Sequence, residues 1–382
     1  MHASQLRIAL FSGNYNYVRD GANQALNRLV GHLLSQGATV RVYSPTTKTP
    51  AFPPTGDLVD VPALGVPGRG EYRLAIGLPA KTRRDLESFA PNMVHLSAPD
   101  ILGHRALSWA RRHGVPAVAS VHTRFDTYVA YYGLGFLAPA ARAIQRRFYR
   151  RCDAILAPAP SMAEILRAER MNFDIGIWSR GVDRHIFTPA ARSLPWRREL
   201  GIADDAFVIG FLGRLVLEKG LGVFAEVIAE LERRGVKHRV MVIGEGPARG
   251  WFAERVPGAV FTGFQSGADL GRAVASMDVL FNPSTTETFG NVTLEAMACA
   301  VPVVAAIATG TSSLVEHGVN GRLAEPEDVN GYANALQAYA EDRDLADSDG
   351  LAGEAKSHAY GWDAINQAVL DKYLEVMARR GL

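Results

Sequence analysis

Two glutamates eight positions apart, Glu287 and Glu295, stand in the stretch whose residue types point most clearly to chemistry. Residues 287–298 read ETFGNVTLEAMA and follow an apolar run, so Glu287 is expected at a strand end and Glu295 about two helical turns further along. A ligand that reaches both carboxylates needs hydroxyl groups at both ends. A nucleotide sugar has them, with sugar hydroxyls at Glu287 and ribose hydroxyls at Glu295. The alternative is an ordinary helix with one glutamate in its first turn and another on its solvated face.

The start of the same helix offers backbone N–H groups to a ligand. The first N–H groups of a helix have no partner within it, and they favour oxygen-rich or anionic ligands. Three residues are expected near this point: Phe289, Gly290 and Asn291. We therefore assign them to the same candidate site as the two glutamates.

A basic loop precedes these residues in the chain. Residues 213–220 read GRLVLEKG, follow an apolar run and come before a helical pattern. Arg214 and Lys219 are therefore expected at the carboxyl end of a strand. A planar guanidinium and a compact ammonium together suit a diphosphate. The alternative is an ordinary basic loop, since such loops after strands are common.

The first half of the chain offers two more candidates. Gly21 lies in the loop that leads into the first helical segment, where a glycine would let a phosphate or sugar approach the backbone closely. The loop has neither the dinucleotide-binding glycine pattern nor that of a phosphate-binding P-loop, and a plain turn glycine is the alternative. His122 ends an apolar run and could donate to a sugar hydroxyl or to an oxygen with developing charge. The other nine histidines show no comparable setting, and a structural role for His122 is the alternative.

Residues 133–151 read GLGFLAPAARAIQRRFYRR and combine an apolar tip with an arginine-rich helix. The tip consists of Leu134, Phe136 and Leu137. Arg142, Arg146 and Arg150 recur every four residues and share one helical face, with Arg147 beside them. Such a segment suits the surface of an anionic membrane. The alternative is a solvated arginine face on an ordinary packed helix.

Short apolar runs alternate with helical patterns in both halves of the chain, which places these residues at strand ends. The runs are continuous rather than alternating, as is typical of strands buried on both faces of a parallel sheet. They comprise residues 7–13, 39–45, 93–99, 116–123 and 153–160 in the first half, and 207–214, 238–246, 259–264, 277–284 and 302–310 in the second. The pattern predicts two doubly wound α/β domains, which bind ligands beyond the carboxyl ends of their strands.

The boundary between the predicted domains falls in residues 187–206, which contain two prolines and few apolar runs and are interpreted as a linker. This divides the chain into domains 1–186 and 187–360. A last helical segment, 361–382, either caps the second domain or returns to the first. A ligand held by both domains would lie in the cleft between them.

Composition narrows the function classes. The 382 residues are 48% hydrophobic, and a net charge of +2 is too small for a nucleic-acid-coating protein. The two cysteines, Cys152 and Cys299, provide no disulfide framework or four-thiolate zinc site. No signal peptide or membrane-spanning run is evident, so a cytoplasmic location is expected. Residues 1–190 hold 23 Lys and Arg against 13 Asp and Glu, whereas the rest is acidic, which indicates different partners for the two halves.

Together these residues resemble the retaining glycosyltransferases of family 4, which have the GT-B fold. The resemblance covers nearly the whole chain and is most specific in the two glutamates of residues 287–295, supported by residues 213–220 and by GVDRHIFTP at 181–189. SVHTRFDTY at 120–128 and WSRGVD at 178–183 resemble the subgroup of sulfoquinovosyl- and α-mannosyltransferases that build glycolipids.

The resemblance implies an acceptor site in the first domain and a nucleotide-sugar donor site in the second. It implies that Arg214 and Lys219 bind the diphosphate, and that Glu287 and the amides after it bind the transferred sugar. Glu295 would bind the ribose, His122 would lie beside the sugar, and Gly21 would approach the diphosphate or the acceptor. No cofactor or metal is expected besides the donor, and the last helix is expected to return to the first domain.

The chain departs from the family pattern at one position, and alternatives for its function and its sugar are left open. Many family members carry two glycines in the first loop, whereas this chain has Asp20 before Gly21. The alternatives are a nucleotide-sugar 2-epimerase of the same fold and a non-catalytic subunit that binds nucleotide sugars. The sugar is left open among UDP-glucose, UDP-glucuronate, UDP-sulfoquinovose and GDP-mannose. Arg180 and Arg19 could meet an acidic sugar, but both are interpreted as solvated surface arginines. A lipid acceptor and a peripheral position on the inner face of the cytoplasmic membrane are expected.

Overall fold

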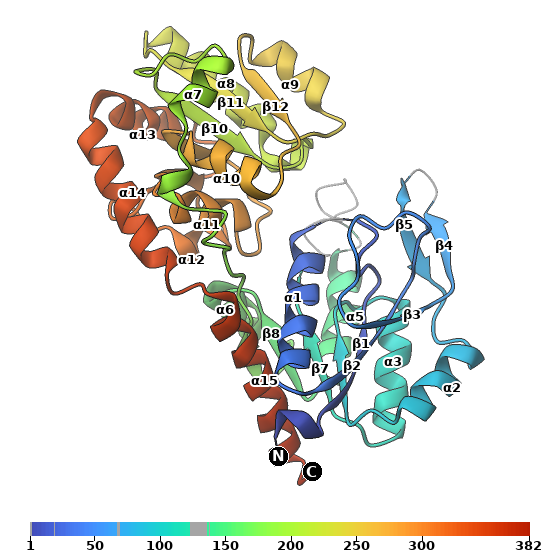
Figure 1. Cartoon of the computed structure of the whole chain (residues 1–382). Coiled ribbons are helices and arrows are strands. Elements are labelled where there is room, and N and C mark those ends of the chain that lie inside the picture. The colour runs from blue at the N-terminus through green and yellow to red at the C-terminus, as the bar shows by residue number, and fades with distance from the viewer. Residues whose placement is uncertain (1, 19, 67–68, 123–135, 137) are drawn as a thin grey trace. The chain divides into compact units, whose positions relative to one another are not determined.

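The computed structural model describes residues 2–18, 20–66, 69–122, 136 and 138–382 (Figure 1). Contacts within the chain divide it into two compact units. Unit 1 comprises residues 1–180 and 362–382, and unit 2 comprises residues 181–361. The change of unit thus falls six residues before the boundary that we expected at 186. Each unit is described by itself.

Unit 1 is built on a parallel sheet of seven strands in the order β3-β2-β1-β6-β7-β8-β9. The strands are β1 (Arg7–Phe11), β2 (Thr39–Ser44), β3 (Asp57–Asp60), β6 (Met93–Leu96), β7 (Ala117–Ser120), β8 (Ala154–Ala157) and β9 (Ile175–Ile177). Five of them lie within the predicted apolar runs, and β3 and β9 were not predicted. A two-stranded antiparallel sheet, β4 (Ala63–Val66) with β5 (Arg69–Ala75), was not predicted either.

Helices surround this sheet, and one of them comes from the far end of the chain. They are η1 (Ala3–Gln5), α1 (Gly21–Ser35), α2 (Ala80–Phe89), α3 (Ile101–Arg112), α5 (Ala138–Tyr149), α6 (Pro160–Ala168) and α15 (Trp362–Arg379). The last helix, α15, follows unit 2 in the sequence but packs beside α1 and β9 of unit 1 (Figure 1). Its side chains Tyr373 and Val376 are fully buried there.

Unit 2 repeats the plan with six parallel strands in the order β12-β11-β10-β13-β14-β15. The strands are β10 (Val208–Leu212), β11 (Arg239–Ile243), β12 (Val260–Gly263), β13 (Val279–Asn282), β14 (Val303–Ala306) and β15 (Arg322–Ala324). Its helices include α8 (Leu221–Arg233), α9 (Arg249–Arg255), α10 (Gly267–Ala275), α11 (Asn291–Ala298), α12 (Thr311–Leu314), α13 (Val329–Glu341) and α14 (Arg343–Ser357). In both sheets the strand order reverses beside the first strand, as in doubly wound folds. The predicted fold class is confirmed.

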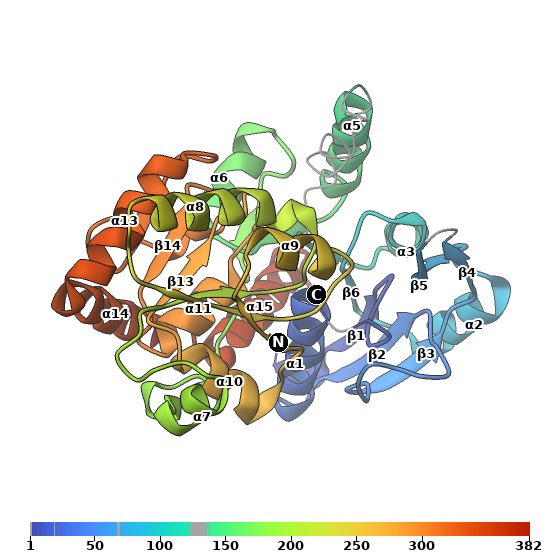
Figure 2. The ribbon, with the colours of Figure 1, turned by 90° about the horizontal axis from the view of Figure 1, so that it is seen from above.

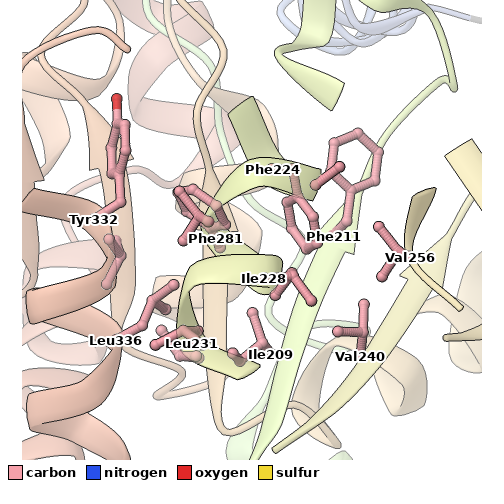
Figure 3. Close-up of a cluster of buried hydrophobic side chains, with 14 of the residues drawn as sticks. Ile209, Phe211, Phe224, Ile228, Leu231, Val240, Val256, Phe281, Tyr332 and Leu336 are labelled. Carbon is pink, nitrogen blue, oxygen red and sulfur yellow. The ribbon is translucent and has the colours of Figure 1, made fainter. Parts of the chain in front are cut away.

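Apolar side chains between the unit 2 sheet and two of its helices form a core. Helices α8 and α13 lie side by side (Figure 2). Phe224 of α8 stacks on Phe281 of β13 with ring centroids 5.0 Å apart and meets Phe211 of β10 edge-on at 5.7 Å (Figure 3). All three side chains are buried, and burying each contributes roughly 1.5–3 kcal/mol. This packing fixes β10 and β13, the two strands whose ends carry the candidate site.

The segment 187–206 is part of unit 2, so its interpretation as a linker is wrong. It forms η3 (Pro189–Ala191) and α7 (Leu194–Glu199), and the fully buried Arg197 donates to Asp278 at 3.2 Å. Arg192 also donates to Asp278, at 2.5 Å. The segment can fold with few apolar residues because one carboxylate compensates these guanidinium charges.

Candidate active site

The loop after β10 carries two cations beside the end of its strand. Its path depends on Gly220, which has a φ of 76° and whose Cβ, if present, would lie 2.8 Å from the carbonyl oxygen of Pro283. The loop therefore lies directly against the segment that follows β13. Arg214 is exposed in this loop, and Lys219 ends the 3-10 turn η4 (Leu217–Lys219) with its side chain 30% exposed.

Lys219 and Glu287, predicted for the diphosphate and for the sugar, come together in unit 2. Lys219 Nζ donates to Glu287 Oε1 at 2.6 Å, and the glutamate side chain is 15% exposed. They follow β10 and β13, the neighbouring strands between which the sheet order reverses, where doubly wound sheets bind ligands. A ligand with an anionic group at Lys219 and a hydroxyl at Glu287 would meet both partners of one charge-assisted hydrogen bond.

A tightly held turn connects Glu287 to α11. Gly290 precedes the helix with a φ of 97°, a left-handed conformation that glycine adopts without strain. Phe289 is buried, with its ring 5.8 Å from that of Tyr360. The N–H of Gly310 donates to the carbonyl oxygen of Glu287 at 3.0 Å. The turn therefore holds the first N–H groups of α11 near the Lys219–Glu287 pair, where they could donate hydrogen bonds to the oxygens of a ligand.

Glu295 lies on α11, partly exposed, in the position predicted for the ribose. Burial raises the pKa of Glu295 to about 8, and the negative charge of Glu287 adds to this shift. At neutral pH Glu295 is therefore mostly protonated. Two hydroxyls that donate to its oxygens would compensate the ionised form and lower its pKa again.

In unit 1 the departure from the family pattern at Asp20 has a structural reason. Asp20 is the N-cap of α1, and its Oδ1 accepts from the N–H of Asn23 at 2.8 Å. Gly21 is the first residue of the helix. The candidate glycine thus lies at a capped helix start, as the loop predicted.

His122, just beyond β7, is tied to polar side chains of unit 1. Its Nδ1 lies 2.7 Å from Nη2 of Arg180, and its Nε2 lies 2.8 Å from Oγ of Ser120. The guanidinium of Arg180 also lies 5.0 Å from the ring of Trp178, which meets the imidazole edge-on. Burial lowers the pKa of His122 well below its usual range, and the charge of Arg180 lowers it further.

Two expectations about this region are wrong. Arg180 is only 5% exposed and is not a solvated surface arginine. Its guanidinium can leave water because two backbone carbonyls and His122 accept from it. His95, in the middle of β6, has a setting comparable to that of His122, because its Nε2 lies 3.0 Å from the same Ser120 Oγ. A histidine inside the apolar run MVHL is the signal that could have identified it. Arg19 lies outside the described residues.

Two of the predicted arginines of α5 are exposed, and the other two are only partly exposed. Arg147 and Arg150 are exposed, and the guanidinium of Arg150 lies 5.6 Å from the ring of Phe173. Phe173 is 86% exposed and Ile144 57% exposed, so apolar and basic groups share this surface. Arg142 lies 3.8 Å from the carboxylate of Glu169, and Arg146 is partly exposed. Phe136 is 76% exposed, whereas Leu134 and Leu137 lie outside the described residues.

Two doubly wound α/β units in one chain are characteristic of the GT-B class of glycosyltransferases. A solved structure is similar to this chain over 97% of the chain and 99% of its own length. It is a sucrose-phosphate synthase from Thermosynechococcus elongatus, with a TM-score of 0.79 and 20% identity. That level of identity concerns the fold alone.

Sequence relatives define the family. Residues 19–185 match the description Glycosyltransferase Family 4, and residues 206–342 match Glycosyl transferases group 1. A GDP-mannose-dependent alpha-mannosyltransferase of Mycolicibacterium smegmatis is 34% identical over 99% of both chains. A sulfoquinovosyl transferase of Arabidopsis thaliana is 30% identical over 94% of this chain and 71% of its own. The chain belongs to glycosyltransferase family 4, and it is an enzyme that acts on nucleotide sugars. Among the described helices, none combines the length and apolarity needed to cross a membrane.

Proposed function

We propose that the protein is a retaining, metal-independent transferase that moves a hexose from a nucleoside-diphosphate sugar to a hydroxyl group of a membrane lipid. The part of this proposal that concerns the donor rests on the 2.6 Å contact between Lys219 and Glu287 beside the start of α11. It joins a cation for the diphosphate, a carboxylate for sugar hydroxyls and the first N–H groups of a helix within one unit.

The chemical problem is to break an anomeric carbon–oxygen bond through a transition state with oxocarbenium character. The leaving diphosphate gains negative charge in this step, and Arg214 and Lys219 would stabilise that charge electrostatically. The acceptor hydroxyl attacks from the face that the diphosphate leaves, and a phosphate oxygen takes the hydroxyl proton. The new glycosidic bond then has the configuration of the old one, and no side chain acts as nucleophile.

The acceptor half is supported by the surface of α5 and the segment before β9. Arg147 and Arg150 are exposed on α5, as is Ile144 one helical turn before Arg147, and the guanidinium of Arg150 lies 5.6 Å from the ring of the exposed Phe173. Apolar groups that insert at the headgroup level, flanked by arginines, suit the surface of an anionic bilayer. The resemblance of residues 120–128 and 178–183 to the glycolipid subgroup of family 4 supports the same acceptor. We place the enzyme on the inner face of the cytoplasmic membrane.

The test is a panel of donors with the purified protein and a lipid extract. UDP-glucose, UDP-glucuronate, UDP-sulfoquinovose and GDP-mannose are each supplied, and products are identified by mass spectrometry and their anomeric configuration by NMR. We expect one donor to give a lipid-linked product of retained configuration, with and without a chelator. Free donor epimerised at C2 would instead indicate the 2-epimerase, and no turnover of any donor would indicate a binding subunit.

A further inference from the structure

Five polar side chains of unit 1 form a continuous chain that we call the polar relay: Tyr373, His95, Ser120, His122 and Arg180. Tyr373 Oη lies 2.6 Å from His95 Nδ1, and His95 Nε2 lies 3.0 Å from Ser120 Oγ. Ser120 Oγ lies 2.8 Å from His122 Nε2, and His122 Nδ1 lies 2.7 Å from Arg180 Nη2. All but His122 are at most 5% exposed. Buried polar groups that satisfy one another in this way hold a single geometry.

The relay joins parts of unit 1 that are far apart in the sequence. His95 comes from β6, Ser120 from β7, and Arg180 from the segment after β9, whereas Tyr373 comes from α15. A second contact anchors α15 near the same place, because Trp178 Nε1 donates to Asn366 Oδ1 at 3.3 Å. The last helix of the chain therefore holds His95 and Trp178, the residues through which it is linked to His122.

Arg180 determines which nitrogen of His122 carries the proton. A guanidinium can only donate, so the Nδ1 of His122 must accept and has no proton. The neutral ring then carries its proton on Nε2 and donates it to Ser120 Oγ. A second proton on Nδ1 would point at the N–H group of a cation. Both ring nitrogens are thus already engaged within unit 1.

The charge of Arg180 supports this arrangement. Among the described residues, no carboxylate lies within 4.0 Å of its guanidinium; the attraction of Asp20 acts from further away. Trp178 and Ser179 accept from Nη1 through their carbonyl oxygens, which leaves the positive charge largely in place. Burial is the main cause of the lowered pKa of His122, and this cation and the ring of His95 lower it further.

We propose that Arg180 is a positioning residue for sugar transfer, which holds the His122 ring neutral and in one tautomer, while Tyr373 anchors the other end of the relay. The proposal rests on the proposed function only for its effect on turnover. It changes the role of His122, because the ring donates to Ser120 rather than to the substrate. The position of the His122 ring is then set by the relay as a whole.

The tautomer is tested without substrate, by NMR of protein labelled with ¹⁵N in its histidines. The signal of His122 is assigned by its loss in His122→Asn. We expect a neutral ring protonated on Nε2 from pH 8 down to about pH 5, below the ordinary histidine pKa of about 6.5. In Arg180→Met the ring should lose its fixed tautomer and titrate closer to that ordinary value. An unchanged signal in Arg180→Met, or a wild-type ring protonated on Nδ1, would overturn the proposal.

The effect on transfer is tested with Tyr373→Phe, which removes one hydroxyl at the far end of the relay. We expect kcat to fall on the order of tenfold with the donor KM nearly unchanged, by analogy with the loss of a hydrogen-bond partner behind a metal ligand. The matched control is Tyr332→Phe in unit 2, where a buried hydroxyl has no hydrogen-bond partner in the described structure. Equal kcat in Tyr373→Phe and wild type would overturn the role in transfer. Absence of turnover in the wild type would contradict the proposed function instead. It would leave the tautomer result unaffected, because the NMR experiment uses no substrate.

Discussion

The two cations after β10 differ in their surroundings, and this affects what each mutation tests. Arg214 is exposed, whereas Lys219 is partly exposed and donates to Glu287. We expect Arg214→Ala and Lys219→Ala each to cost about 2–4 kcal/mol in kcat/KM, the scale of one preorganised electrostatic donor. Lys237→Ala, at an exposed lysine of the same unit, is the control for loss of charge. Steady-state kinetics with the identified donor provide the measurement, and near-normal values for both single variants would exclude the diphosphate clamp.

Mutations of Glu287 and of Glu295 should affect different steps of the reaction. Glu287→Gln keeps the shape of the side chain but weakens its bonds to sugar hydroxyls, so we expect turnover to fall more than nucleotide affinity. Glu295→Ala should chiefly weaken binding of the nucleoside diphosphate, measured by calorimetry. Glu226→Gln, an exposed glutamate on α8, is the control. If both variants retained full activity and lost only thermal stability, the alternative of two structural helix glutamates would be correct.

The raised pKa of Glu295 predicts a pH dependence of stability. The folded protein keeps this proton up to about pH 8, whereas the unfolded chain releases it near its ordinary value of about 4.5. Between these values the folded state binds more protons, so this residue lowers the free energy of unfolding as the pH rises. Glu295→Gln removes the effect. We expect its advantage over wild type in urea unfolding to grow by about 1–2 kcal/mol from pH 5 to pH 8, less than the full shift because the group is partly exposed. If the difference in the free energy of unfolding between the variant and wild type did not change with pH, the pKa of Glu295 would not be shifted in the folded protein.

At the scale of elements, the site depends on a loop conformation that glycine alone adopts without strain. Gly220 combines a φ of 76° with a close approach to the carbonyl oxygen of Pro283. Gly220→Ala should therefore destabilise the protein by roughly 2 kcal/mol or more, because both the left-handed backbone and the contact are penalised. It should also displace Lys219 from Glu287 and reduce kcat/KM. Gly235→Ala, also left-handed but with open space around its Cβ, separates the two penalties. Equal destabilisation of both variants would show that the contact with Pro283 is unimportant.

The sequence predicted the central strands well and the edge strands poorly, for a physical reason. Central strands such as β1 and β13 are buried on both faces and give continuous apolar runs. The missed strands β3, β9 and β15 lie at sheet edges, where one side is open and polar residues are tolerated. The same limit applies to residues 187–206, whose place in unit 2 depends on arginine contacts with one distant carboxylate.

The candidate site shows a similar division. Residues at strand ends and helix starts could be placed from the apolar runs alone, including Lys219, Glu287 and His122. Pairings between distant residues could not, because they depend on which strands become neighbours. The contact of Tyr373 with His95, across 278 positions, is of this kind. The burial of Arg180 was also missed, because a sequence motif does not show which backbone carbonyls will lie around the guanidinium.

At the scale of the whole molecule, the uneven charge of the chain bears on where the enzyme works. Residues 1–190 hold 23 Lys and Arg against 13 Asp and Glu, whereas residues 191–382 hold 18 against 26. An anionic surface would attract the first half and repel the second, and would thereby orient the protein as well as bind it. Each arginine close to such a surface contributes about 1 kcal/mol, and salt weakens this contribution.

Vesicle sedimentation tests this orientation. We expect binding to rise with the fraction of anionic lipid and to fall at high salt. It should drop when Arg146, Arg147 and Arg150 become Ser, because the basic surface of α5 is lost. The matched control changes three arginines of unit 2, Arg233, Arg249 and Arg255, to Ser.

Ile144→Ser with Phe173→Ser should weaken the binding that remains at high salt, since apolar insertion is not screened. Equal and negligible binding to neutral and anionic vesicles at low salt would contradict the membrane proposal and favour a soluble acceptor. An equal loss in the unit 2 control would show that net charge, rather than the α5 surface, drives binding.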